Sequence, residues 1–211
     1  MQDQTSSLLD EILARSQITP LFQPIFELAS GAIFGHEALS RGPQGSLLHM
    51  PNQLFPYAQQ AGRLHELELL CRERAISEFA RLQLPGLLFL NVSASLLSSP
   101  YHQKGMTLSI LRELGLEQSN IVIELSEQHP YDHNGLTHQS VDHYREMGFQ
   151  VAIDDLGVGY SGLRLWSELR PDIVKIDKHF VENIDHDDVK REFVRSIVAI
   201  ARTLKCHVIA E

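Results

Sequence analysis

The chain has 211 residues, the length of one ordinary domain or of a large barrel cut slightly short. Its 43% hydrophobic and 21% charged residues are typical of a soluble globular protein. The net charge of −9 argues against binding to a nucleic-acid polymer, which needs clustered Lys and Arg. A small phosphorylated ligand held through metal ions remains compatible with that charge.

The two cysteines, Cys71 and Cys206, match neither a metal-binding spacing nor a disulfide framework, which indicates a reducing compartment. The first residues lack the basic and apolar regions of a signal peptide. No apolar run approaches the roughly 18 residues that span a bilayer. We therefore expect a cytoplasmic domain without membrane insertion, and a membrane-attached partner or a missing segment stays open.

Apolar periodicity predicts how the chain begins. Apolar residues at helical spacing predict a short amphipathic helix near 5–15, within a lead-in segment of residues 1–17. Two strand-like runs, at 21–26 and 33–39, flank a turn that contains Gly31. This arrangement is typical of a β-hairpin.

After the hairpin, two helices are expected and then strands alternate with helices. The two helices are predicted near 52–60 and 64–84. Strands are predicted at 87–90, 121–123, 151–153, 173–176 and 207–210, with further helices near 104–115, 135–147 and 186–204. Alternation of this kind indicates βα units around a parallel sheet, here with seven strands when the hairpin is included.

The predicted strands share one feature, a polar residue where each apolar run ends. Any one of these residues alone could be a helix cap or a solvated turn residue. In a (β/α) barrel, however, the carboxyl ends of the strands converge on one face, where active sites are found. Agreement among six strands favours such a shared site. The residues are Glu37, Asn91, Glu124, Asp154 with Asp155, Asp177 and Glu211, and Lys175 lies inside the sixth strand.

The adjacent Asp154 and Asp155 set a condition on the backbone. Consecutive strand residues point to opposite faces, so both can share one site only where the strand ends and its twist breaks down. Two carboxylates about 4 Å apart repel by about 4 kcal/mol at an effective dielectric near 20, so one is protonated or a cation lies between them. The alternative is that one caps the next helix and the other is solvated.

The candidate ligands also indicate which metal the site would take. Carboxylate and amide oxygens, without Cys or His, favour Mg²⁺ or Mn²⁺ over Zn²⁺. A carboxylate pair that can bridge suggests two ions roughly 3.5–4 Å apart, the arrangement used in phosphoryl chemistry. Four other histidines invite a zinc site, but their spacing does not keep them on one helical face; these are His129, His133, His138 and His143.

Several segments, in this order and at about this spacing, resemble the EAL-domain family: FQPIF, HEALSRG, FLNVSASLL, IVIELSE, VAIDDLGVGYSGL, DIVKID and VIAE. The resemblance covers roughly residues 18–211. It implies an α/β fold, a modified TIM (β/α)8 barrel with one antiparallel strand. It also implies hydrolysis of the bacterial second messenger cyclic di-GMP to linear pGpG with two Mg²⁺ or Mn²⁺ ions, Ca²⁺ being inhibitory.

The resemblance also assigns roles to individual residues. Lys175 would orient the attacking water or stabilise charge on the phosphate, and Glu211 would be the general base or a ligand of a metal-bound water. Asp155 would hold or bridge to the second ion. Glu127 would position the loop Leu156–Leu163, which couples dimerisation to catalysis in the family. The metal ligands would be Glu37, Asn91, Glu124, Asp154, Asp155 and Glu211, and the ligand-binding residues Gln23, Leu39, Arg41 and Asp177.

The chain departs from the family pattern at two places. Leu156 stands where many members have Phe, which we expect to change packing and not chemistry. The sequence stops at Glu211, where the family continues with an eighth strand, a helix and a Gln-Gly motif. We therefore expect residues 18–211 to be an EAL domain that lacks its last strand and helix. In the full-length protein we expect a homodimer, with a further signalling domain where one is present.

Two other functions stay open at this point. A degenerate EAL domain would bind cyclic di-GMP as a sensor without hydrolysing it, although no acid at a metal position is lost up to Glu211. A different metal-dependent barrel enzyme would act on another phosphodiester. Elsewhere, we expect Trp166 to pack with Leu163 and Leu165, and the acidic run 185–188 to cap the helix that follows it.

Overall fold

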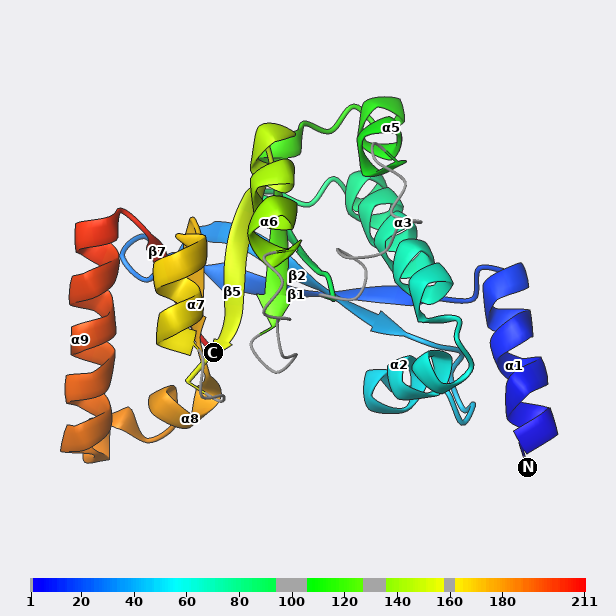
Figure 1. Ribbon diagram of the computed structural model, residues 1–211, viewed down its shortest axis with the longest axis horizontal. Coiled ribbons are helices and arrows are strands. Elements are labelled where there is room, and N and C mark those ends of the chain that lie inside the picture. The colour runs from blue at the N-terminus through cyan, green and yellow to red at the C-terminus, as the bar shows by residue number, and fades with distance from the viewer. Residues whose placement is uncertain (1, 94–105, 127–135, 158–161) are drawn as a thin grey trace. The chain divides into compact units, whose positions relative to one another are not determined.

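The structure is a computed structural model that describes residues 2–93, 106–126, 136–157 and 162–211. The chain divides into two compact units. Unit 1 comprises Met1–Leu90 with Gln103–Asn120, and unit 2 comprises Asn91–His102 with Ile121–Glu211. Each unit combines helices with part of the sheet, and Figure 1 labels the elements of both.

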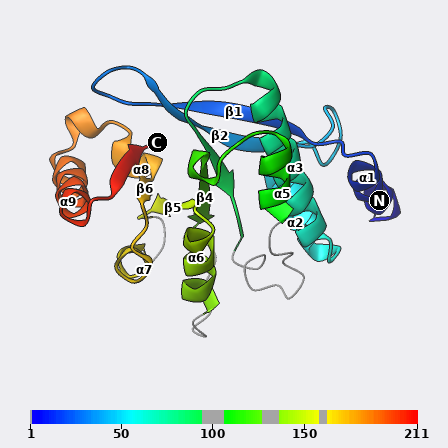
Figure 2. The same ribbon diagram turned by 90° about the horizontal axis from the view of Figure 1, so that it is seen from above.

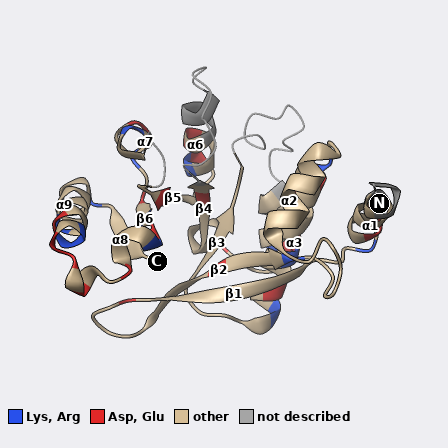
Figure 3. Cartoon of the chain, turned by 90° about the horizontal axis from the view of Figure 1, so that it is seen from below, with Lys and Arg blue, Asp and Glu red and all other residues tan. Residues whose placement is uncertain are grey.

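Unit 1 begins with a helix, a hairpin and two further helices, as the sequence predicts. Strand β1 pairs antiparallel with β2, and β2 pairs parallel with β3. Strand β1 carries no charged residue (Figure 3). The elements of unit 1 are α1 (Gln2–Ala14), β1 (Thr19–Phe26), β2 (Ile33–Arg41), α2 (Pro51–Gln60), α3 (Leu64–Leu82), β3 (Leu87–Asn91, its last residue in unit 2), α5 (Met106–Glu113) and η1 (Gln118–Asn120).

The apolar face of α1 is buried within unit 1. Leu9 and Ile12 belong to one apolar cluster with Leu54 of α2 and Leu67 of α3. At the surface, Arg63 pairs with Asp10 of α1 and adds a charged contact beside that cluster. The periodic residues from which the first helix was predicted therefore pack into the core of this unit.

Unit 2 contains four parallel strands in chain order, β4 to β7 (Figure 2). The Val and Ile residues of strands β4 to β6 are buried. Strands of a parallel sheet are rich in such residues because helices cover both faces of the sheet. The elements of unit 2 are β4 (Ile121–Ser126), α6 (Leu136–Glu146), β5 (Gln150–Leu156), α7 (Gly162–Leu169), β6 (Ile173–Ile176), α8 (Lys178–Val181), η2 (Ile184–His186), α9 (Asp188–Leu204) and β7 (His207–Ala210).

The helices of unit 2 differ in part from those predicted. Helices α7 and α8 were not predicted, and Leu163 of α7 is 65% exposed, so the prediction that it packs with Trp166 is wrong. Trp166 and Leu165 are buried, as expected. The acidic run caps α9 as predicted, because Asp187 Oδ1 accepts hydrogen bonds from the N–H groups of Val189 and Lys190.

A search of the described helices finds none with both the length and the apolar character that crossing a bilayer requires.

Candidate metal centre

One ammonium group lies among three carboxylates in unit 2. Lys175 of β6 is only 1% exposed, and its Nζ lies 2.9 Å from Glu124 Oε1 of β4. The same Nζ lies 2.9 Å from Asp154 Oδ1 of β5 and 2.7 Å from Glu211 Oε1, directly after β7. A buried charge is tolerated when it is paired and hydrogen-bonded. Lys175 therefore offsets the mutual repulsion of three acids, two within β4 and β5 and one directly after β7.

The register of the parallel strands explains why these four side chains meet. Asp154 and Lys175 lie side by side, because Ile153 pairs with Val174 one residue earlier. Glu124 pairs with Ala152, two residues before Asp154, so both acids point to the same face. Lys175 in turn pairs with Ile209, two residues before Glu211. The predicted strand ends at Glu124 and Asp154 are wrong, because β4 continues to Ser126 and β5 to Leu156. The register nevertheless brings the four side chains together.

Asp155 joins the cluster through an irregularity of β5. The pairing of β5 with β6 shifts between Ile153 and Leu156, and Asp155 has a left-handed backbone with φ of 55°. The N–H of Asp155 donates to Asp154 Oδ1 at 3.0 Å. As a result, ligand oxygens of Asp154, Asp155 and Glu211 all lie within 4.8 Å of one another. The backbone thus meets the condition for two adjacent aspartates to share one site.

Asn91 adds an amide to the same group of side chains. Its Nδ2 donates to Glu124 Oε2 at 3.3 Å. Glu124 is fully buried. Its Oε1 contacts Lys175, and its Oε2 accepts the hydrogen bond from Asn91. With Nδ2 directed at Glu124, Oδ1 is the atom of this amide that could ligate a cation.

The donor set fits a hard divalent cation. Asp154, Asp155 and Glu211 offer only carboxylate oxygens, which Mg²⁺ and Mn²⁺ prefer. With Glu124 the group contains four carboxyl groups, of which Glu124, Asp154 and Glu211 contact the ammonium of Lys175. When all of them are ionised, a negative charge is left over that a bound cation would neutralise. The residues of unit 2 therefore agree with the metal predicted from the sequence.

The candidate residues of unit 1 lie on one face of the hairpin. Glu37, Leu39 and Arg41 alternate along β2, so their side chains point to the same face. Gln23 of β1 stands directly opposite Glu37 in the antiparallel register. Glu37 lies inside β2 and not at its end, so the predicted strand end is wrong. The strand continues to Arg41 because the first turn-forming pair, Gly42–Pro43, comes after it.

Asp177 and Glu127 complete the predicted set. Asp177 follows β6 and caps α8, since its Oδ1 accepts from the N–H of His179 at 2.9 Å. Glu127 lies outside the described residues, as do residues 158–161 of the loop Leu156–Leu163.

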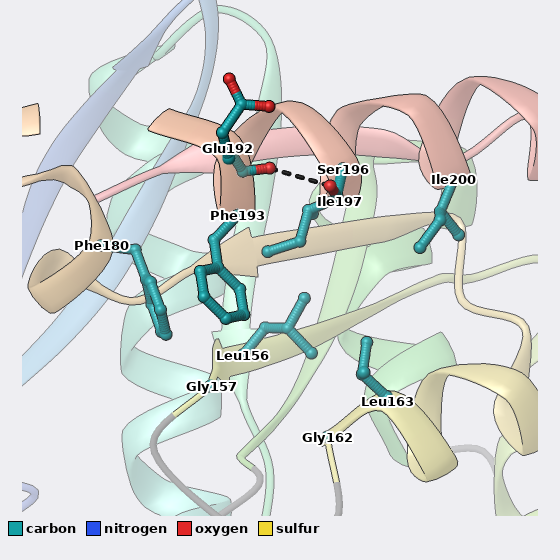
Figure 4. A pocket seen from close by; sticks show the side chains of 10 residues that line it. All are labelled: Leu156, Gly157, Gly162, Leu163, Phe180, Glu192, Phe193, Ser196, Ile197 and Ile200. Carbon is teal, nitrogen blue, oxygen red and sulfur yellow. Dashed lines mark hydrogen bonds between the residues drawn. The ribbon is translucent and has the colours of Figure 1, made fainter. Parts of the chain in front are cut away.

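Sequence reasoning missed an apolar pocket in unit 2, beside the end of β5. Its volume is about 490 Å³, and Figure 4 shows the side chains that line it. Phe180 of α8 and Phe193 of α9 form part of its wall next to Leu156 and Gly157. The sequence signal for one wall of this pocket is the apolar spacing of residues 193, 197 and 200 along α9.

Comparison with known proteins identifies the family to which the chain is similar. The family model described as "EAL domain" matches residues 6–211. The chain is 31% identical over 208 residues to "Probable cyclic di-GMP phosphodiesterase PdeB" of Escherichia coli (strain K12), covering 96% of this chain and 39% of that protein. It is 28% identical to the "Bifunctional diguanylate cyclase/cyclic di-GMP phosphodiesterase MucR" of Pseudomonas aeruginosa, covering 100% of this chain and 32% of that protein. The chain thus spans less than half the length of these curated relatives.

Solved structures give the same result for the fold. The "EAL Enzyme Bd1971" in its cAMP and cyclic-di-GMP bound form has a TM-score of 0.84 at 23% identity, covering 99% of this chain and 58% of that one. The "Klebsiella pneumoniae BlrP1 pH 8.0 calcium/cy-diGMP complex" has a TM-score of 0.82 at 28% identity, covering 92% of this chain and 48% of that one. These similarities and the seven-stranded sheet confirm the predicted α/β class, a partial TIM barrel with one antiparallel strand. The chain belongs to the EAL-domain family.

Proposed function

We propose that this domain hydrolyses cyclic di-GMP to linear pGpG with two Mg²⁺ or Mn²⁺ ions, and that Ca²⁺ inhibits it. The observation that carries the proposal is the cluster of Glu124, Asp154, Asp155 and Glu211 around Lys175. The names of the relatives support the substrate, and complexes of BlrP1 with cyclic di-GMP and either calcium or manganese support the type of cofactor.

The cations would be held by the oxygen ligands that the sequence predicts: Glu37, Asn91, Glu124, Asp154, Asp155 and Glu211. Bound divalent cations supply neutralisation of phosphodiester charge and activation of a water molecule. Asp155 would hold or bridge to the second ion, because its ligand oxygen lies within 4.8 Å of those of Asp154 and Glu211.

Lys175 would have two roles in turn. Its three N–H donors match the three carboxylates that it contacts, so in the resting site it fixes their spacing. The Glu211 side chain is 29% exposed, against 0% for Glu124 and 12% for Asp154. The contact with Glu211 therefore faces solvent and is the one that can open. Lys175 would then orient the attacking water or donate to the phosphate, and Glu211 would accept the proton of that water.

The hairpin face of unit 1 would bind the nucleotide. Arg41 would pair with a phosphate, to which its planar guanidinium can donate two parallel hydrogen bonds. Gln23 and Leu39, which share that face, would line the nucleotide pocket. Asp177 would contact the ligand beside Lys175, and Glu127 would position the loop Leu156–Leu163. For the full-length protein we propose a cytoplasmic homodimer with a further signalling domain.

The test uses the full-length protein that contains these residues, incubated with Mn²⁺ and cyclic di-GMP while chromatography follows pGpG. The proposal predicts pGpG from the wild type, none with EDTA, and little from Asp154→Asn. Asp185→Asn is the matched control, because it makes the same chemical change at an exposed carboxylate that contacts His186. Tight binding of cyclic di-GMP by the wild type without any pGpG would contradict hydrolysis and support the sensor function.

A further inference from the structure

The segment that carries Asp155 is sharply bent. Asp155 has a φ of 55° and Gly157 a φ of 110°, and the pairing with β6 is interrupted between Ile153 and Leu156. A left-handed backbone at a residue other than glycine costs roughly 1–3 kcal/mol, and it persists only where the surroundings hold it. Some other part of unit 2 must therefore support this turn.

Phe180 lies directly against the turn. A Cβ atom built on Gly157 would overlap the Phe180 ring and would lie 3.1 Å from its Cζ. Figure 4 shows Phe180 and Phe193 at the end of the pocket where β5 reaches Gly157. Glycine at position 157 is thus required twice, for its positive φ and for the close approach of the ring.

The ring itself is held from two sides. It packs edge-on against His179, with centroids 5.2 Å apart and an interplanar angle of 85°. It also packs against Phe193 of α9, with centroids 5.8 Å apart. The N–H of Asp177, which caps α8, donates to Leu156 O at 3.5 Å. Helix α8 is thus attached to the end of β5, and Phe180 cannot shift without these contacts changing.

From this arrangement we infer that Phe180 is a positioning residue for Asp155. Its ring packs against Gly157 at the end of the turn 155–157 and so keeps Asp155 in place beside Asp154 and Glu211. Phe180 acts through Asp155 and not on a substrate. The inference rests on the proposed function, in which Asp155 is a metal ligand.

The pocket explains why the loss of this ring has a consequence. The apolar pocket of about 490 Å³ is lined by Phe180 together with Leu156 and Gly157 of the turn. Removing the ring would enlarge this space beside Gly157 and take away an aromatic contact of the turn. The turn could then relax toward an ordinary strand conformation, in which Asp155 would point away from Asp154.

The test measures the affinity of the full-length protein for Mn²⁺ in the absence of nucleotide. Electron paramagnetic resonance detects the Mn²⁺ that remains unbound in solution. Phe180→Ala is expected to weaken binding by about tenfold, the size typical of changes just behind metal ligands. Ile200→Ala is the control. It removes an apolar side chain from the wall of the same pocket at a position away from Phe180 (Figure 4), and binding is expected to stay within about twofold. Phe180→Leu should lose less affinity than Phe180→Ala, and it replaces that variant where alanine prevents folding.

A double-mutant cycle checks the contact itself. Gly157→Ala should weaken Mn²⁺ binding in the wild type, through both the clash with Phe180 and the positive φ. In the Phe180→Ala background the clash is absent and only the positive φ opposes alanine at position 157. Gly157→Ala should therefore reduce the Mn²⁺ affinity less in that background than in the wild type. Equal effects of Phe180→Ala and Ile200→Ala, with Mn²⁺ bound by the wild type, would overturn the inference alone. A wild type that binds no Mn²⁺ would overturn the proposed function together with the inference.

Discussion

Lys175 Nζ lies 2.7 Å from Glu211 Oε1, between the neighbouring strands β6 and β7. This contact joins the last residue of the sequence to the buried Glu124 and Asp154 through a single ammonium. An acidic cluster of this kind is stable only while its charge is compensated, either by Lys175 or by bound cations. The predictions that follow treat those two sources of positive charge separately.

Lys175→Met removes the internal cation and leaves Glu124 and Asp154 buried without it. Breaking a buried ion pair in this way costs about 3–5 kcal/mol. We expect the free energy of unfolding, measured with urea in EDTA, to fall by about that amount. Saturating Mn²⁺ should restore more stability to the variant than it adds to the wild type.

Lys190→Met is the control for that change. The Lys190 ammonium lies at the surface and donates to the backbone oxygen of Glu182, so the variant should unfold like the wild type. Equal stability of both lysine variants in EDTA would show that Lys175 does not compensate the cluster.

Glu37→Ala and Asp154→Ala remove proposed metal ligands from unit 1 and unit 2. Changes just behind metal ligands already cost about 10–100-fold in affinity or activity, so loss of a ligand should lower turnover by at least about a hundredfold. The measurement is the initial rate of pGpG formation with saturating Mn²⁺. A rate within about tenfold of the wild type for either variant would remove that residue from the ligand set.

Burial raises the pKa of the Cys71 thiol to about 11, above the value near 9 expected in the unfolded chain. The folded state therefore holds this proton more tightly, and the stability gained from it is complete below pH 9 and lost as the pH rises toward 11. By linkage, about 1 kcal/mol should be lost by pH 10. Urea unfolding at pH 8 and pH 10 should show this loss, and Cys71→Ala should lack that part of it. The same pH dependence in Cys71→Ala would assign the loss to other groups.

Asp187→Ala removes the side chain that caps α9, which accepts from the N–H groups of Val189 and Lys190. The free energy of unfolding should fall by about 1 kcal/mol, the usual contribution of such a cap. Asp185→Ala, in the same acidic run, serves as the comparison because the Asp185 carboxylate contacts His186, whereas Asp187 is the N-cap of α9. A change of equal size at Asp185 would point to the charge of the run and not to the cap.

The sequence predicted the elements whose signal is local. The Val and Ile runs of β4, β5 and β6 are buried as expected, and the Gly-containing turn joins the two strands of the hairpin. The adjacency of Asp154 and Asp155 even predicted that the strand must become irregular there, and the bulge and the φ of Asp155 confirm it.

Other features depend on contacts between distant residues and could not be read from the sequence. Helix α7 covers only eight residues, and its buried Leu165, Trp166 and Leu169 also suit a packed loop. The three contacts of Lys175 depend on the register of β4 to β7, which no single strand specifies. The approach of Phe180 to Gly157 likewise depends on how α8 packs against the end of β5. In contrast, the capping role of Asp177 follows a local pattern that could have been recognised.

The most direct test of the metal centre is the anomalous diffraction of Mn²⁺ in crystals of the full-length protein with cyclic di-GMP. We predict two anomalous peaks, both within coordination distance of the carboxylates of Asp154 or Asp155. Lys175 should remain beside Asp154 without ligating either ion. Bound nucleotide with no anomalous peak at these carboxylates, while the ammonium of Lys175 alone balances their charge, would contradict the account.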